Sequence, residues 1–91
     1  MKVRALIAWN LRRIRVAQGL SQERLAHDAR MDRAYVGAIE RQTMNPTADV
    51  LERLSDALAV HVSELFMEPE PGATEPPNLR KGRRRLRDAG L

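Results

Sequence analysis

The residues with the most distinctive chemistry in this sequence lie within residues 32–41. At helical spacing, Arg33, Ala34, Gly37 and Ala38 share one face, and the apolar residues of the segment share the opposite face. The first face is small and basic, so a partner can approach it closely. The guanidinium of Arg33 can donate two parallel hydrogen bonds to guanine O6 and N7, and the alanine methyl groups can contact thymine. This pattern predicts a helix that enters the major groove of DNA.

Other kinds of chemistry find little support in the sequence. The two histidines, His27 and His61, are isolated from each other in the sequence, and we expect surface or capping roles for them. The chain contains no cysteine, which excludes a disulfide framework and a cysteine-based metal site. No Ser/His/Asp order, glycine-rich phosphate loop or pair of facing carboxylates stands out. We therefore expect a binding protein without metal or cofactor, and not an enzyme.

The elements that must position the basic face are helices. Apolar residues at helical spacing predict five of them, which would form a compact all-α unit. They cover residues 4–18, two short segments joined by a turn within 20–41, residues 48–59, and a short segment after residue 60. Ser21, Asp32 and Thr47 are expected to cap the second, third and fourth helices, and either His61 or Ser63 the fifth.

Length and composition divide the chain into two parts. Ninety-one residues allow one small domain, which we place at residues 1–67. Residues 68–91 begin with a proline-rich segment and end in a basic tail, in which residues 79–91 hold six Lys or Arg and one Asp. The linker composition predicts flexibility. The tail could add contacts to nucleic acid, bind a partner or second subunit, or remain solvated.

The sequence also bears on location and on the class of partner. No run approaches 18 apolar residues, so we expect no membrane-spanning segment. Arginines interrupt the apolar pattern of the first helix, which argues against a secretory signal. We therefore expect a cytoplasmic protein at the bacterial nucleoid. The formal net charge of +4 mildly favours a nucleic-acid partner.

Four segments in order, GLSQERLA, MDRAYVGAIER, NPTADVLERLSDAL and VSELF, resemble the Xre/Cro-like, lambda-repressor-like helix-turn-helix proteins. The similarity covers about residues 4–66, and the segment DRAYVGAIER also resembles restriction-modification controller proteins. Arg30 and Gln42 stand where the family usually has glycine. Those positions often have positive φ, which is costly for a residue with a Cβ.

The resemblance implies roles for individual residues. Residues matching positions that face base edges are Arg33, Ala34 and Ala38. Residues matching positions near phosphates are Gln22, Tyr35, Arg41, Thr43 and Asn45. For Arg33, a phosphate contact or a solvated position beside Asp32 is the alternative. Tyr35 could be purely structural, and Thr43 and Asn45 could simply form the turn before Pro46.

The same resemblance implies structural and oligomeric roles. Arg15 and Glu40 match a pair that joins the first helix to the third. Subunits of the family usually pair through the last two helices, which here indicates Val62, Leu65 and Phe66. We therefore expect a transcriptional regulator that binds a near-palindromic operator in double-stranded DNA as a homodimer. The alternatives are an antitoxin that binds a toxin protein and represses its own operon, and a module that binds only proteins.

Overall fold

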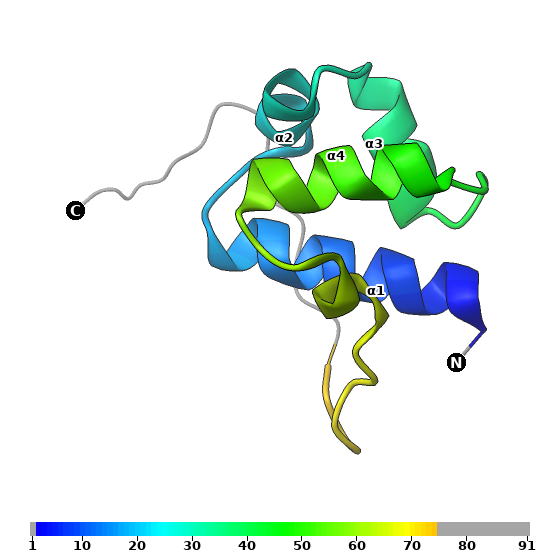
Figure 1. Ribbon diagram of the computed structural model, residues 1–91. Coiled ribbons are helices and arrows are strands. Elements are labelled where there is room, and N and C mark those ends of the chain that lie inside the picture. Colours follow the sequence, from blue (N-terminus) through cyan, green and yellow to red (C-terminus); the bar gives the residue numbers. More distant parts are fainter. Residues whose placement is uncertain (1, 75–91) are drawn as a thin grey trace.

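The computed structural model describes residues 2–74, and these residues form a small helical bundle without strands. In chain order the elements are α1 (Val3–Ala17), α2 (Gln22–Ala29), α3 (Arg33–Glu40), α4 (Ala48–Leu58) and a 3-10 helix, η1 (Val62–Phe66). Figure 1 shows α2 and α3 together at one end of the molecule, with α4 passing in front of them and α1 below. The predicted all-α class is confirmed.

Short polar side chains begin the helices, as the sequence predicts. Ser21 accepts a hydrogen bond from the Arg24 amide, and Thr47 accepts one from the Val50 amide. Asp32 accepts from the Ala34 amide at the start of α3. Each of these caps satisfies an amide that has no partner within its helix. Of the two candidates for the last cap, it is His61 that accepts from the Ser63 amide.

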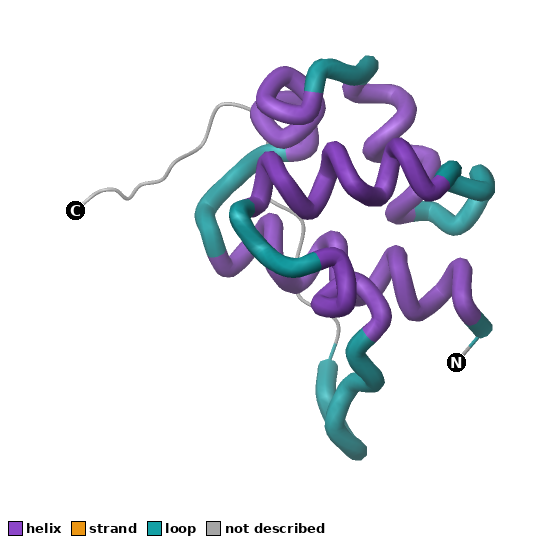
Figure 2. Tube along the Cα trace, viewed as in Figure 1, coloured by secondary structure: helices purple, strands orange, loops and turns teal. Residues whose placement is uncertain are grey.

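Figure 2 shows the loops that join these helices in teal. They contain three non-glycine residues with positive φ. Arg30, in the turn between α2 and α3, has a φ of 60°, and Gln42, after α3, has a φ of 64°. These are the two positions where the sequence replaces an expected glycine. Ala59, which ends α4 with a φ of 58°, was predicted to lie within the helix. All three residues adopt the left-handed conformation, which is unfavourable for a residue with a Cβ.

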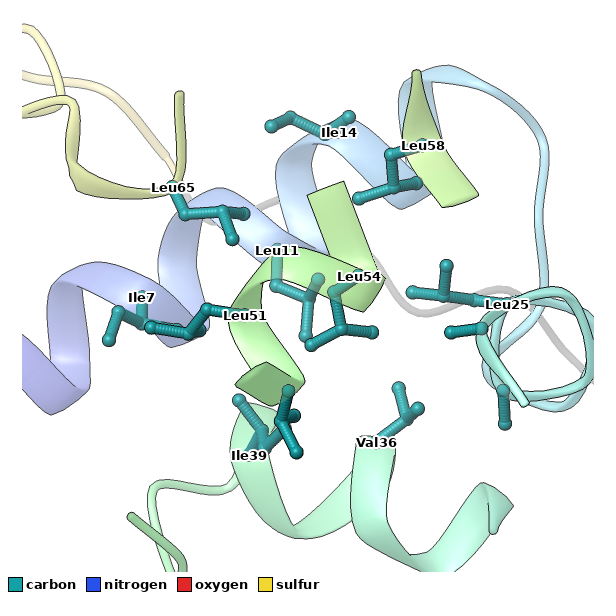
Figure 3. Packing of buried hydrophobic residues seen from close by; sticks show 13 residues of the cluster. Ile7, Leu11, Ile14, Leu25, Val36, Ile39, Leu51, Leu54, Leu58 and Leu65 are labelled. Atoms are coloured by element: carbon teal, nitrogen blue, oxygen red, sulfur yellow. The ribbon is translucent and has the colours of Figure 1, made fainter. Parts of the chain in front are cut away.

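One hydrophobic core holds the bundle together, and every element contributes to it (Figure 3). Its fully buried centre includes Leu11 of α1, Leu25 of α2, Val36 of α3 and Leu54 of α4. α3 packs against α1 and α2, while α4 packs against α2 and η1. Burying a side chain of this size stabilises the fold by about 1.5–3 kcal/mol. The apolar face of α3 is therefore fixed inward, and its other face must point outward.

The last element differs from the prediction in type. Residues 62–66 form a 3-10 helix of five residues, where the sequence suggested a short α-helix. Five residues make little more than one helical turn, and 3-10 geometry is common in such short connecting segments. After η1 the described chain continues to residue 74 without helix or strand. The basic tail and the rest of the predicted linker, residues 75–91, lie outside the described residues.

Candidate nucleic-acid interface

α3 presents the predicted contact face to solvent. Arg33 and Ala34 are exposed, and Ala38 is half-buried. On the opposite side Val36 and Ile39 are buried in the core. None of the three predicted base-contacting residues is fully buried, so each remains accessible to a partner at least in part.

A buried ion pair fixes the end of α3 to α1. Nε of Arg15 donates to Oε2 of Glu40 at 2.7 Å, and Nη2 donates to Oε1 at 2.9 Å. Both side chains are fully shielded from solvent. Nη1 of Arg15 donates in addition to the Leu20 carbonyl at 2.8 Å, and Nε of Arg12 lies 3.3 Å from Oε1 of Glu40. The carboxylate thus receives several charge-assisted hydrogen bonds, which compensate for its loss of water.

Gln22 extends this network to α2. Its Nε2 donates to Oε1 of Glu40 at 3.0 Å, so one amide hydrogen is already used. The second hydrogen stays available for the phosphate contact that the sequence predicts, because a side-chain amide has two donors. Gln22 is half-buried at the first position of α2, where the helix dipole favours an anion. Glu40 therefore sets the relative positions of α1, α2 and α3.

A surface hollow of about 280 Å³ lies between the start of α2 and the outer face of α3. Its lining residues are Gln22, Asp32, Arg33, Ala34, Gly37 and Arg41. The guanidinium groups of Arg33 and Arg41 border this hollow. Neither group has a hydrogen-bonding or ion-pair partner within residues 2–74. Both cations can therefore bind external acceptors such as phosphate oxygens or base edges.

The remaining predicted phosphate contacts differ in their surroundings. Tyr35 is half-buried and packs against the hydrophobic core, so its ring has a structural role whatever its hydroxyl contacts. Asn45 is exposed in the loop before α4. Oγ1 of Thr43 donates to the Ala38 carbonyl at 3.2 Å, at the end of α3. A phosphate contact donated by Thr43 would therefore have to replace this hydrogen bond.

The predicted dimer residues do not all reach the surface, and Leu65 requires a correction. Its side chain has no exposed area and belongs to the core of its own chain. The 3-10 turn directs Leu65 inward, while Val62 and Phe66 remain exposed by 36% and 40%. Met67, which follows directly, is exposed by 51% and adds apolar area that the prediction did not include. The apolar surface at η1 therefore comprises Val62, Phe66 and Met67.

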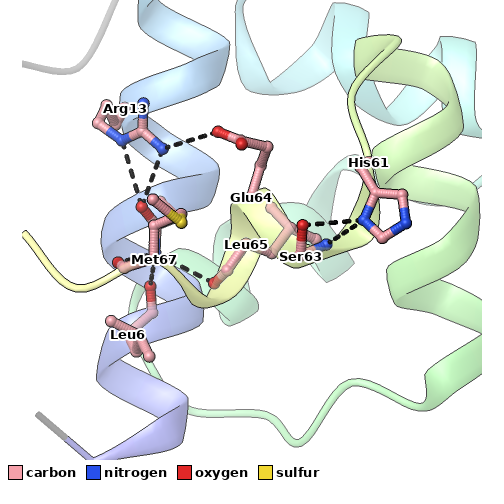
Figure 4. Close-up of polar contacts among 8 residues, drawn as sticks. Leu6, Arg13, His61, Ser63, Glu64, Leu65 and Met67 are labelled. Atoms are coloured by element: carbon pink, nitrogen blue, oxygen red, sulfur yellow. Dashed lines mark hydrogen bonds and ion pairs between the residues drawn. The ribbon is translucent and has the colours of Figure 1, made fainter.

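Asn10 is a buried polar residue that was not among the predicted site residues. Its Nδ2 donates to the carbonyls of Leu65 and Met67 at 3.1 and 2.8 Å, and its Oδ1 accepts two hydrogen bonds from Arg13. Figure 4 shows this region, with Arg13 also directed towards Glu64. Asn10 thus joins the end of η1 and the residue that follows it to α1. A signal existed, because Asn10 lies among the apolar positions of its helix.

Two features are absent from the part of the chain that the structure describes. No group of three or more His, Cys, Asp or Glu side chains within residues 2–74 could hold a metal ion. In that same part of the chain, no helix has both the length and the apolar character that crossing a membrane requires.

The helical bundle and the exposed α3 that follows α2 are typical of helix-turn-helix proteins, and comparison with known proteins gives the same class. The HTH_3 helix-turn-helix family model matches residues 11–65. The chain therefore belongs to this family, the Xre/Cro-like helix-turn-helix proteins.

Individual relatives lie in the same group. A hypothetical transcription factor of Neisseria meningitidis is 40% identical over 68 residues, which are 75% of this chain and 64% of that protein, so this chain spans less than two thirds of it. Control protein C.BamHI of Bacillus amyloliquefaciens is 38% identical over 65 residues, covering 70% of this chain and 80% of that protein. The crystal structure of the restriction-modification controller protein C.AhdI of Aeromonas hydrophila superposes with a TM-score of 0.68 at 40% identity, covering 69% and 96% of the two chains.

Proposed function

We propose that this protein is a sequence-specific DNA-binding transcriptional regulator that acts as a homodimer on a near-palindromic operator. The main support for the proposal is the outer face of α3. Arg33 and Ala34 are exposed on this face, while the opposite face of the helix is buried in the core. The relatives named as a transcription factor and as control proteins support the same function. Such a regulator would work in the cytoplasm, at the nucleoid.

In this proposal the residues around α3 divide into two groups. Arg33 donates to guanine, and the methyl groups of Ala34 and Ala38 contact neighbouring bases. Gln22, Tyr35, Arg41, Thr43 and Asn45 contact phosphates and fix the register of the helix on the duplex. Because the alanines have no polar atoms beyond the backbone, Arg33 provides most of the direct base discrimination. Sequence-dependent DNA shape contributes the remainder.

A single α3 contacts too few base pairs to select one site in a genome, so two subunits are needed. The exposed apolar side chains at η1, Val62, Phe66 and Met67, are the surface we propose for pairing. Two-fold pairing would place the two α3 helices about 34 Å apart, one turn of DNA. The operator would then carry two inverted half-sites at that spacing.

The pairing surface can be tested by replacing Phe66 with serine. Phe66 is exposed in the monomer, so the variant should fold normally and raise the dimer dissociation constant at least about tenfold, as loss of 1.4 kcal/mol would. Sedimentation equilibrium over a range of concentrations measures this constant. Val3→Ser removes another exposed apolar side chain, at the start of α1, and serves as the control. If Phe66→Ser and Val3→Ser had the same dimer dissociation constant, η1 would be excluded as the interface.

DNA binding itself is tested by titrating the full chain into a labelled genomic fragment that contains its own promoter, with an unrelated duplex of equal length as competitor. The proposal predicts a retarded complex that survives excess competitor at about 0.15 M salt. Affinity for both duplexes should fall as salt rises, because phosphate contacts release counterions. A complex that the unrelated duplex removes as readily as unlabelled promoter DNA would contradict specific binding. Nothing in the fold or in the relatives named above favours the antitoxin alternative.

A further inference from the structure

Gly37 is the least expected residue on the outer face of α3. It lies in the interior of an eight-residue helix with ordinary helical φ, so no turn requires a glycine there. Glycine inside a helix costs roughly 0.5–1 kcal/mol relative to alanine. The position is also buried, although it lies on the side of α3 that faces away from the core. A side chain from elsewhere must therefore cover it.

The covering groups are Arg41 and Gln22. A Cβ built on Gly37 would lie 3.0 Å from Nη1 of Arg41 and 3.9 Å from Cζ of the same residue. The first distance is shorter than an ordinary contact, so the guanidinium would have to shift by a few tenths of an ångström. Oε1 of Gln22 would be 3.5 Å away, an ordinary van der Waals contact, so Gln22 could stay. The missing side chain at position 37 thus provides space for the Arg41 guanidinium in particular.

This placement brings Arg41 back along α3. The side chain begins after the last helical residue, yet its guanidinium lies over Gly37 beside Gln22. It therefore borders the same hollow as Arg33, which begins the helix. The guanidinium groups of two residues that are eight positions apart in the sequence therefore lie beside the same hollow. Gln22 is itself held by Glu40, so one wall of the space occupied by Arg41 is fixed.

We propose that Gly37 is a positioning residue, which seats the guanidinium of Arg41 over α3 and so directs it to the stretch of DNA that Arg33 contacts. This inference rests on the proposed function. An alanine at position 37 shifts the Arg41 guanidinium from this place and so weakens its phosphate contact, although alanine favours the helix. Stability and DNA affinity therefore respond to this residue in opposite directions.

The test is a double-mutant cycle with Gly37→Ala and Arg41→Ala in the full chain. Gly37→Ala should raise Tm by about 2–6 °C because alanine favours helix. It should also weaken binding to the operator about fivefold, since a hydrogen bond to a charged group is weakened. In the Arg41→Ala background, Gly37→Ala should change affinity less than about twofold. The same loss in both backgrounds, or no loss in either, would overturn the proposal.

A measurement without DNA separates this inference from the proposed function. Relaxation of the Arg41 side-chain Nε by NMR should show a more ordered guanidinium in the wild-type protein than in Gly37→Ala. The exposed Arg53 of α4 is the internal reference, and its relaxation should not change. Equal mobility of Arg41 in both proteins would refute the seating whatever the protein binds. Absence of specific binding by the wild-type chain, with Arg41 ordered as expected, would refute the proposed function alone.

Discussion

Replacing Glu40 with glutamine should lower the free energy of unfolding by about 3–5 kcal/mol. The substitution keeps the shape of the side chain but removes the charge that compensates Arg15, which is completely buried beside it. Only one carboxamide oxygen then remains to accept from Arg15, Arg12 and Gln22, and it carries no charge. Domains of this size are stable by only about 5–15 kcal/mol, so much of that margin would be lost. Urea unfolding followed by circular dichroism measures the change.

An exposed ion pair in the same protein provides the control. Arg24 and Asp28 pair one turn apart on α2 at 3.1 Å, and the Arg24 side chain is 66% exposed. Asp28→Asn should therefore change the free energy of unfolding by no more than about 0.5 kcal/mol. If Glu40→Gln were as mild as Asp28→Asn, the carboxylate would not be what fixes α3 to α1 and α2.

Replacing Arg33 with alanine should weaken binding to the operator by about 1–3 kcal/mol for each half-site. The guanidinium is exposed at the first turn of α3 and has no partner within residues 2–74, so nothing in the fold depends on it. Affinity for unrelated duplex DNA should change much less, because phosphate contacts made by other residues dominate it. Fluorescence anisotropy titrations with both duplexes at the same salt concentration give the two dissociation constants.

The charge-matched control is Arg53→Ala, an exposed arginine on α4 outside the α2–α3 pair. It should leave the ratio of specific to unrelated affinity unchanged. A uniform loss on all duplexes with Arg33→Ala would instead assign Arg33 to a phosphate. Discrimination between bases would then have to come from DNA shape or from residues other than those of the α3 face.

Features that depend on near neighbours in the chain could be predicted from the sequence. The caps at Ser21, Asp32 and Thr47 are of this kind, since each side chain bonds an amide two or three residues further on. The positive φ at Arg30 and Gln42 followed from comparison with a family pattern. The two faces of α3 followed from helical spacing. Together these features locate the exposed face of α3, and the family resemblance supplied the roles of its residues.

Features that depend on distant contacts could not be predicted in the same way. Asn10 bonds carbonyls 55 and 57 residues away, and no local pattern identifies those partners. Whether Leu65 faces the core or a second subunit depends on how η1 folds back against α1, a tertiary property. The reason for a glycine at position 37 becomes clear only when the position of the Arg41 guanidinium is known. A glycine inside a helix indicates that something lies close to it, without showing what.

The most direct measurement of the central claim is selection of bound sequences from a pool of random duplex DNA, with the full chain at about 0.15 M salt. A homodimer that inserts two α3 helices should enrich two inverted half-sites whose centres are one helical turn apart. A guanine in each half-site should lose its preference when the selection is repeated with Arg33→Ala. Recovery of unenriched DNA, or of a single half-site with no symmetric partner, would contradict the account.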